Sequence, residues 1–191
     1  MTENLYKSVR THHKPTPDWK MPTITLFGVM LLLALGGAIF TVMRTQYFYN
    51  RFRTDLLYSV VYARENNSFA AYAGDEELTR EIPDNFLGAI GGQGRPTHAP
   101  QDPADLTVSF GNGSSVRVWN TQFADYSRGH GAVWKPGIVL EYTGVDGRQY
   151  IIEREDDFFY LQFWLSGQIK DYYHPTEEES ASLQAFLEKI S

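Results

Sequence analysis

The longest apolar stretch of the chain runs from Met21 to Met43 without a charged residue. As a helix it would be roughly 33 Å long at 1.5 Å per residue, which matches a bilayer hydrocarbon core of about 30 Å. Aromatic and basic residues flank both of its ends, as they do at headgroup depth. A cleaved signal peptide would have a shorter apolar run and a small-residue cleavage site. The pattern therefore predicts a retained transmembrane helix over residues 21–43, behind a basic N-terminal arm of residues 1–20.

The next segment, residues 44–66, continues the helical periodicity but has only one apolar stripe. The stripe consists of Phe48, Phe52, Leu56, Val60 and Ala63. This spacing predicts a helical stalk that prolongs the transmembrane helix and ends at the Asn66–Asn67 pair. We expect the stripe to pack on a sheet.

Beyond the stalk, apolar and polar residues alternate with the period of two that is typical of half-buried strands. The clearest case is residues 106–119, where two alternating runs flank a Gly-Asn-Gly-Ser turn. Further hairpins are predicted over residues 69–82, over 137–155 and over 158–173.

Two shorter helical patterns complete this part of the chain. Pro83 opens a segment that Gly91 and Gly92 close, which predicts a helix over residues 83–90. Thr176 is followed three residues later by Glu179, and this capping box predicts the start of a C-terminal helix. The apolar stripe of that helix would be Leu183, Phe186, Leu187 and Ile190.

The predicted fold class is therefore α+β, with a transmembrane helix and stalk followed by one soluble domain over residues 67–191. Its core would be a meandering antiparallel sheet of hairpins, with a short internal helix and a C-terminal helix on one face. Residues 93–104 contain three prolines and are predicted to form a surface loop. A small β-barrel with a terminal helix would have the same order of elements and is the alternative.

Charge divides the chain into two parts. Residues 1–64 hold eight Lys/Arg against three Asp/Glu, whereas residues 65–191 hold nine against twenty. An acidic domain repels phosphate backbones, so nucleic-acid binding is not expected. The chain has no cysteine, which excludes disulfides, thiolate metal sites and a cysteine nucleophile.

The segment over residues 120–137 is the best candidate for a functional site, because it reads as a long polar loop that contains glycine. The candidate ligand- or partner-binding residues are Asp125, Tyr126, Arg128, His130 and Trp134. Asp125, Ser127 and His130 are residue types that serve nucleophilic catalysis, which makes a membrane-anchored hydrolase one alternative. No nucleophile elbow, phosphate-binding loop or metal-ligand spacing is present, so no catalytic residue, metal or cofactor is predicted.

These features together favour a single-pass membrane protein that is a non-enzymatic interaction or sensing module. We expect its N-terminus in the cytoplasm, its acidic domain outside, and the lipid bilayer and a membrane-associated protein as partners. Ala34, Gly37 and Ala38 would let two transmembrane helices approach closely, so a homo-oligomer is a further expectation. A structural subunit of a membrane complex is the other alternative.

Overall fold

The computed structural model describes residues 20–125, 131–155 and 175–191 of the chain. The chain divides into two compact units, Met1–Ile39 and Phe40–Ser191, and all the strands lie in the second. The elements are α1 (Lys20–Asn66), β1 (Ala70–Ala73), β2 (Glu76–Glu77), α2 (Phe86–Ile90), β3 (Arg95–Pro96), β4 (Leu106–Ser109), β5 (Ser115–Asp125), β6 (Val133–Thr143), β7 (Gln149–Glu155) and α4 (Glu177–Ile190).

The N-terminal half of α1 is the apolar segment expected from the sequence. In the described part of the chain, α1 is the one helix long and apolar enough to cross a membrane. None of its most apolar window is buried by the rest of the protein, and Leu32 and Leu33 are 70% and 71% exposed. Exposing so many large apolar side chains to water is costly, whereas a bilayer would cover them.

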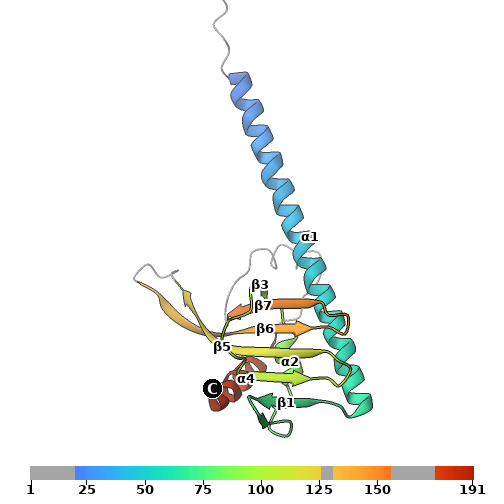
Figure 1. The fold of residues 1–191 in the computed structure, drawn as a ribbon. Coiled ribbons are helices and arrows are strands. Elements are labelled where there is room, and N and C mark those ends of the chain that lie inside the picture. The colour runs from blue at the N-terminus through green and yellow to red at the C-terminus, as the bar shows by residue number, and fades with distance from the viewer. Residues whose placement is uncertain (1–19, 126–130, 156–174) are drawn as a thin grey trace, which may run out of the picture. The chain divides into compact units, whose positions relative to one another are not determined.

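The strands form one open antiparallel sheet in the order β2-β1-β4-β5-β6-β7-β3 (Figure 1). The hairpins predicted over 106–119 and 137–155 are confirmed as β4–β5 and β6–β7. The hairpin predicted over 69–82 is present as β1–β2, but its second strand is Glu76–Glu77, where the sequence predicts the turn, and residues 78–82 are not a strand. The described strands form an open sheet with β2 and β3 at its edges, so the alternative of a small barrel is wrong. The hairpin predicted over 158–173 lies outside the described residues.

The prediction of a surface loop over residues 93–104 is wrong in one detail. Arg95 and Pro96 form β3, which pairs with Glu153 and Ile152 of β7 and so covers one edge of the sheet. Thr97 continues this contact, because its N–H donates to the Ile151 carbonyl at 3.1 Å. The pairing joins segments more than fifty residues apart, so no local pattern marks it.

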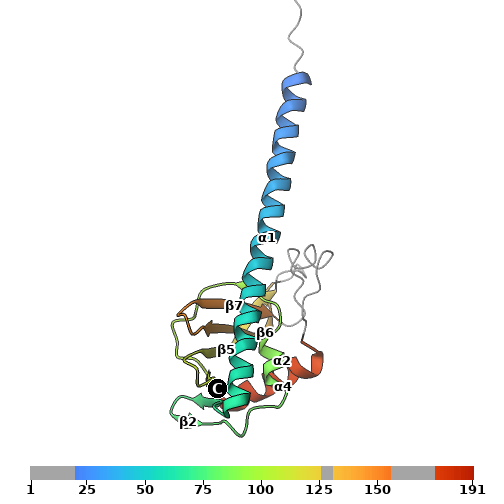
Figure 2. The same cartoon turned by 90° about the vertical axis from the view of Figure 1, so that its right-hand side faces the viewer.

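The helices pack on one face of the sheet, as the sequence predicts (Figures 1 and 2). Alternate strand residues such as Val118 and Leu140 are fully buried there. They join Phe52 of α1, Phe86 of α2 and Leu183 of α4 in a single hydrophobic cluster. The predicted stalk stripe supplies the α1 side of this core.

Each of the two shorter helices has one end where the sequence predicts it. α2 ends at Ile90 with Gly91 as its C-cap, as predicted, but begins at Phe86, three residues later than predicted. The Thr176 hydroxyl accepts from the Glu179 N–H at 3.1 Å, and the Glu179 carboxylate accepts from the Thr176 N–H at 2.8 Å. This capping box fixes the start of α4 and confirms the prediction.

A row of polar side chains, which we call the polar seam, joins α1 to the sheet inside this core. The Tyr150 hydroxyl donates to the Asp55 carboxylate at 2.8 Å, and the Tyr142 hydroxyl donates to the Asp55 carbonyl at 2.9 Å. Ser114 donates to Ser59 at 2.7 Å, and Ser59 lies 2.8 Å from the Tyr142 hydroxyl. Burial raises the pKa of both tyrosines above the ordinary value, which keeps both hydroxyls protonated as donors.

The packing on α1 predicts different costs for two apolar residues of the same helix. Phe52→Ala should lower the free energy of unfolding by about 3–5 kcal/mol, because it leaves a cavity between α1 and the rings of Tyr142 and Tyr150. Leu57→Ala is the matched control. Leu57 is 60% exposed, so its truncation should change the free energy by less than about 0.5 kcal/mol. Urea titration of the full chain in detergent would compare the two, and equal losses would contradict the packing described here.

Candidate functional site

The β5–β6 hairpin continues beyond the strands on either side of it (Figure 1). β4 pairs with β5 only as far as Val118, and β7 pairs with β6 only from Gly137 onward. Past those points, residues 122–125 and 133–136 pair with each other and, among the described residues, with no other strand. We call these two segments the hairpin arm. The prediction of a loop over residues 120–137 is therefore wrong, because most of that segment is strand.

Trp134 is the most exposed apolar side chain of the hairpin arm. By strand alternation it lies on the same face of β6 as Ile138 and Leu140, the face that the helices cover within the sheet. The cover from α4 reaches β5 at Asn120, whose side-chain oxygen accepts from Gln184 at 2.9 Å. Beyond that contact Trp134 is 63% exposed, and its neighbour Val133 is 41% exposed. The hairpin arm thus carries core-type residues on a face that no other described element covers at Val133 and Trp134.

Two residues stiffen the base of the hairpin arm. A Cβ atom on Gly137 would lie 2.6 Å from the Phe123 ring, so this ring rests directly across the glycine backbone. An aromatic ring laid over a strand glycine supplies packing that the glycine lacks. Pro136 lies just beyond the last described pair of β6 and β7, Gly137 with Glu155, and proline is tolerated at a strand edge because it has no N–H to donate. An isolated two-stranded ribbon is only marginally stable, so this base supports the exposed end.

The structure locates two of the five candidate residues. Asp125 pairs with Val133, and Trp134 pairs with Ala124, so both candidates lie at the far end of the hairpin arm. Tyr126, Arg128 and His130 lie outside the described residues, as does Ser127 of the alternative hydrolase site. The ligand- or partner-binding role of the candidates stays a prediction, and the hydrolase stays an untested alternative.

The face of the sheet opposite the helices carries charged pairs that the sequence did not single out. Glu141 is 3% exposed, and its carboxylate accepts from Arg117 at 2.6 Å. The Arg117 guanidinium lies 5.3 Å from the centre of the Trp119 ring. The Trp119 indole donates to the Asp102 carbonyl at 2.9 Å and is 4% exposed, so this tryptophan is closed to a partner. These contacts satisfy buried groups and leave no reactive side chain free.

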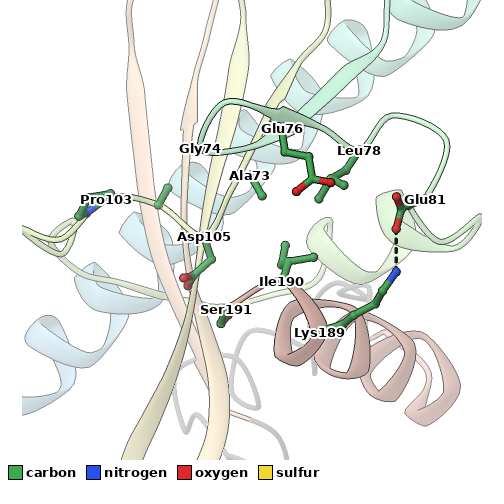
Figure 3. A pocket seen from close by; sticks show the side chains of 11 residues that line it. Ala73, Gly74, Glu76, Leu78, Glu81, Pro103, Asp105, Lys189, Ile190 and Ser191 are labelled. Atoms are coloured by element: carbon green, nitrogen blue, oxygen red, sulfur yellow. Dashed lines mark hydrogen bonds and ion pairs between the residues drawn. The ribbon is translucent and has the colours of Figure 1, made fainter.

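A solvent-accessible cavity of about 660 Å³ lies between the β1–β2 turn, the 103–105 segment and the end of α4 (Figure 3). Its walls carry Glu76, Glu81, Asp105 and Lys189. Lys189 donates to Glu81 at 2.7 Å, which raises the pKa of this exposed lysine, and Asp105 accepts from the Asn120 N–H at 2.7 Å. The volume suits a small ligand, but Lys189, Glu81 and Asp105 each already have a hydrogen-bond partner within the domain.

Two smaller cavities flank α1, and neither includes a residue of the hairpin arm. One of about 380 Å³ lies beside Val60, Phe69 and Phe86, and one of about 260 Å³ lies beside Asp55 and Tyr58. Within the described ranges, no three His, Asp or Glu side chains are grouped closely enough to hold a metal ion. Among the described residues, the hairpin arm with its exposed Val133 and Trp134 is therefore the best candidate for a functional site.

Comparison with protein-family models, with curated proteins and with solved structures finds no match to this chain.

The two described tryptophans of the sheet differ in exposure, so replacing them should have very different effects on the free energy of unfolding. Trp134→Ala should change the free energy of unfolding by less than about 0.5 kcal/mol, because most of the ring already lies in solvent. Trp119→Ala should cost about 3–5 kcal/mol, since it removes a buried ring and the partner of the Asp102 carbonyl. Denaturant titration of both variants measures this. A large loss for Trp134→Ala would mean that the arm serves packing and is no free surface.

Proposed function

We propose that the protein is a single-pass, membrane-anchored interaction module whose hairpin arm binds a protein at the same membrane. The observation that carries this proposal is the paired extension of β5 and β6 with Val133 and Trp134 exposed. Exposed apolar residues on a rigid ribbon are typical of interaction sites, and tryptophan is enriched among the residues that contribute most to binding.

The anchor in this proposal is the N-terminal half of α1. Its apolar length supports insertion in a bilayer. The basic N-terminal arm, residues 1–20, precedes it in the sequence. Four Lys/Arg precede the apolar span and three follow it closely, a small excess that favours a cytoplasmic N-terminus. The acidic domain of residues 67–191 would then lie outside the cytoplasm.

The non-enzymatic part of the proposal rests on how the described polar groups are used. The buried carboxylates of Glu141 and Glu153 are held by arginines, and the polar seam holds Asp55 in hydrogen bonds from tyrosines. Groups arranged in this way stabilise the fold by satisfying one another. Among the described residues, the surface proposed for binding is the exposed apolar part of the hairpin arm.

The orientation can be tested because the chain has no cysteine of its own. Single cysteines at Ser8 and at Ser191 would be exposed in intact cells to a maleimide that does not cross membranes. We expect labelling of Ser191→Cys alone, with both variants labelled after lysis. Labelling of Ser8→Cys alone would reverse the topology and place the acidic domain in the cytoplasm.

The interaction surface can be tested by replacing Trp134 with a photoreactive amino acid in intact cells. A protein adduct is expected from position 134 but not from Val145, the matched control, which is 60% exposed in the β6–β7 turn. The captured protein, once purified, should bind Trp134→Ala about thirtyfold more weakly than the wild type, which corresponds to about 2 kcal/mol. Equal adducts at both positions, or equal affinities, would rule out the arm as the binding surface.

A further inference from the structure

The segment of α1 from Leu56 to Ala63 has no charged residue and is apolar on both sides of the helix. On the side that packs on the sheet, Leu56 and Val60 are 4% and 9% exposed. On the outer side, Tyr58 and Val61 are 66% and 44% exposed, and no described element lies over them (Figure 2). A helix that is apolar all round is normally buried all round. The outer side of this segment is therefore the kind of surface that another molecule covers.

The same exposed face extends toward the N-terminal side of the segment. Tyr47 is 69% exposed, and Thr54 is exposed as well. Positions 47, 54, 58 and 61 are seven, four and three residues apart, so their side chains share one face of the helix. We call Tyr47, Thr54, Tyr58 and Val61 the outer stripe. All four lie within the Phe40–Ser191 unit, and none of them is Lys, Arg, Asp or Glu.

Charge limits which surfaces of two identical copies can meet. Residues 65–191 hold twenty Asp/Glu against nine Lys/Arg, so most faces of one copy repel those of another. The outer stripe can face its own copy without bringing like charges together and without taking a charge out of water. A second copy of the chain therefore matches this surface in both polarity and charge.

The outer stripe also has a centre about which two copies can be related. Thr54 follows Tyr47 by seven residues and precedes Val61 by seven. Identical chains most often associate about a twofold axis, which makes both copies use the same surface. Whether the two helices run parallel or antiparallel, an axis at this centre places Thr54 of one copy against Thr54 of the other. A small residue at that point lets two helices approach closely.

The exposed area of the outer stripe indicates how strong such a contact would be. If a whole tyrosine side chain presents on the order of 200 Å², the stripe and the flanking Leu57 together present roughly 450 Å². Two copies would then bury about 900 Å², less than the roughly 1,200 Å² of stable interfaces in solution. A shared bilayer raises the effective concentration of anchored copies, which offsets the small area. We therefore expect the pair in a membrane and its separation in excess detergent.

We propose that two copies of this chain pair through the outer stripe of α1, with Thr54 of each copy at the centre of the contact. The inference rests on the proposed anchoring, which confines the copies to one bilayer. It uses residues other than Ala34, Gly37 and Ala38, from which the sequence predicts an oligomer. It also leaves the hairpin arm available for a different protein.

Disulfide trapping of the full chain tests this pairing in membranes isolated from cells that produce it, because the chain has no cysteine of its own. Mild oxidation should convert Thr54→Cys to a covalent dimer, since the Cα atoms of a disulfide lie about 4.4–6.8 Å apart and only closely packed helices bring them there. Ala185→Cys, at an exposed position of α4, is the matched control and should give severalfold less dimer. Equal yields from the two variants would overturn the inference.

Extraction of the same membranes with alkaline carbonate separates the pairing from the anchoring. A protein that spans the bilayer stays with the membrane, whereas a peripheral protein is released. If the wild type is released, the anchoring has failed and the pairing fails with it. If the wild type is retained but Thr54→Cys gives no dimer, only the pairing is wrong.

The apolar nature of the contact can be tested in the Thr54→Cys chain. Adding Tyr58→Glu should lower the yield of dimer severalfold, because it places a carboxylate from each copy in the contact. Ala185→Glu, the same charge on α4, is the control and should leave the yield unchanged. Circular dichroism would show that both variants keep the fold, as expected for exposed positions. An unchanged yield in folded Tyr58→Glu would contradict a contact through the outer stripe.

Discussion

The fold depends on one contact, the docking of residues 45–63 of α1 across the open face of the sheet. Phe52 and Leu56 supply the apolar part of this contact, and the polar seam gives it direction. A tyrosine hydroxyl reaches its acceptor from only a few positions, so Tyr142 and Tyr150 fix how far along the sheet Asp55 sits. α2 and α4 then fill the rest of the same face. The segment that continues the apolar span is thus also the central element of the core.

The sequence predicted those elements whose stability is local or follows one period. The α1 stripe, the alternation around the Gly-Asn-Gly turn and the Thr176 capping box are each determined within a few residues. The sequence does not predict β3, because Arg95 and Pro96 show no strand pattern. Pairing with β7 forms this strand, and in that pairing Arg95 contacts Glu153, fifty-eight residues away. The extension of β5 and β6 was missed for a related reason. The 120–137 segment that contains it has polar residues and glycines and so resembles a loop, whereas the pairing of the extension continues a register established at Ser115–Thr143.

The candidate residues were selected for their chemistry, whereas the structure draws attention to their surroundings. Trp134 is a candidate because it is an aromatic residue in a polar segment. The sequence does not indicate that its side chain lies on the helix-covered face of the sheet at a point that no described helix covers. That cover comes from α4, where Gln184 meets Asn120 across sixty-four positions in sequence. Val133 was not selected, although an apolar pair of residues beside a glycine-rich turn could have indicated the end of a hairpin.

The burial of Thr45 and Tyr49 has a consequence for how the domain could be released from a membrane. Many anchored proteins have a flexible stem that a protease can cut without harm to the domain. Here a cut after Tyr49 would remove part of the core, and a cut between Phe52 and Ala63 would remove most of the α1 contribution to it. Shedding of an intact domain would need cleavage before Thr45, at the very boundary of the apolar span. An anchor of the kind proposed would therefore hold this domain permanently at its membrane.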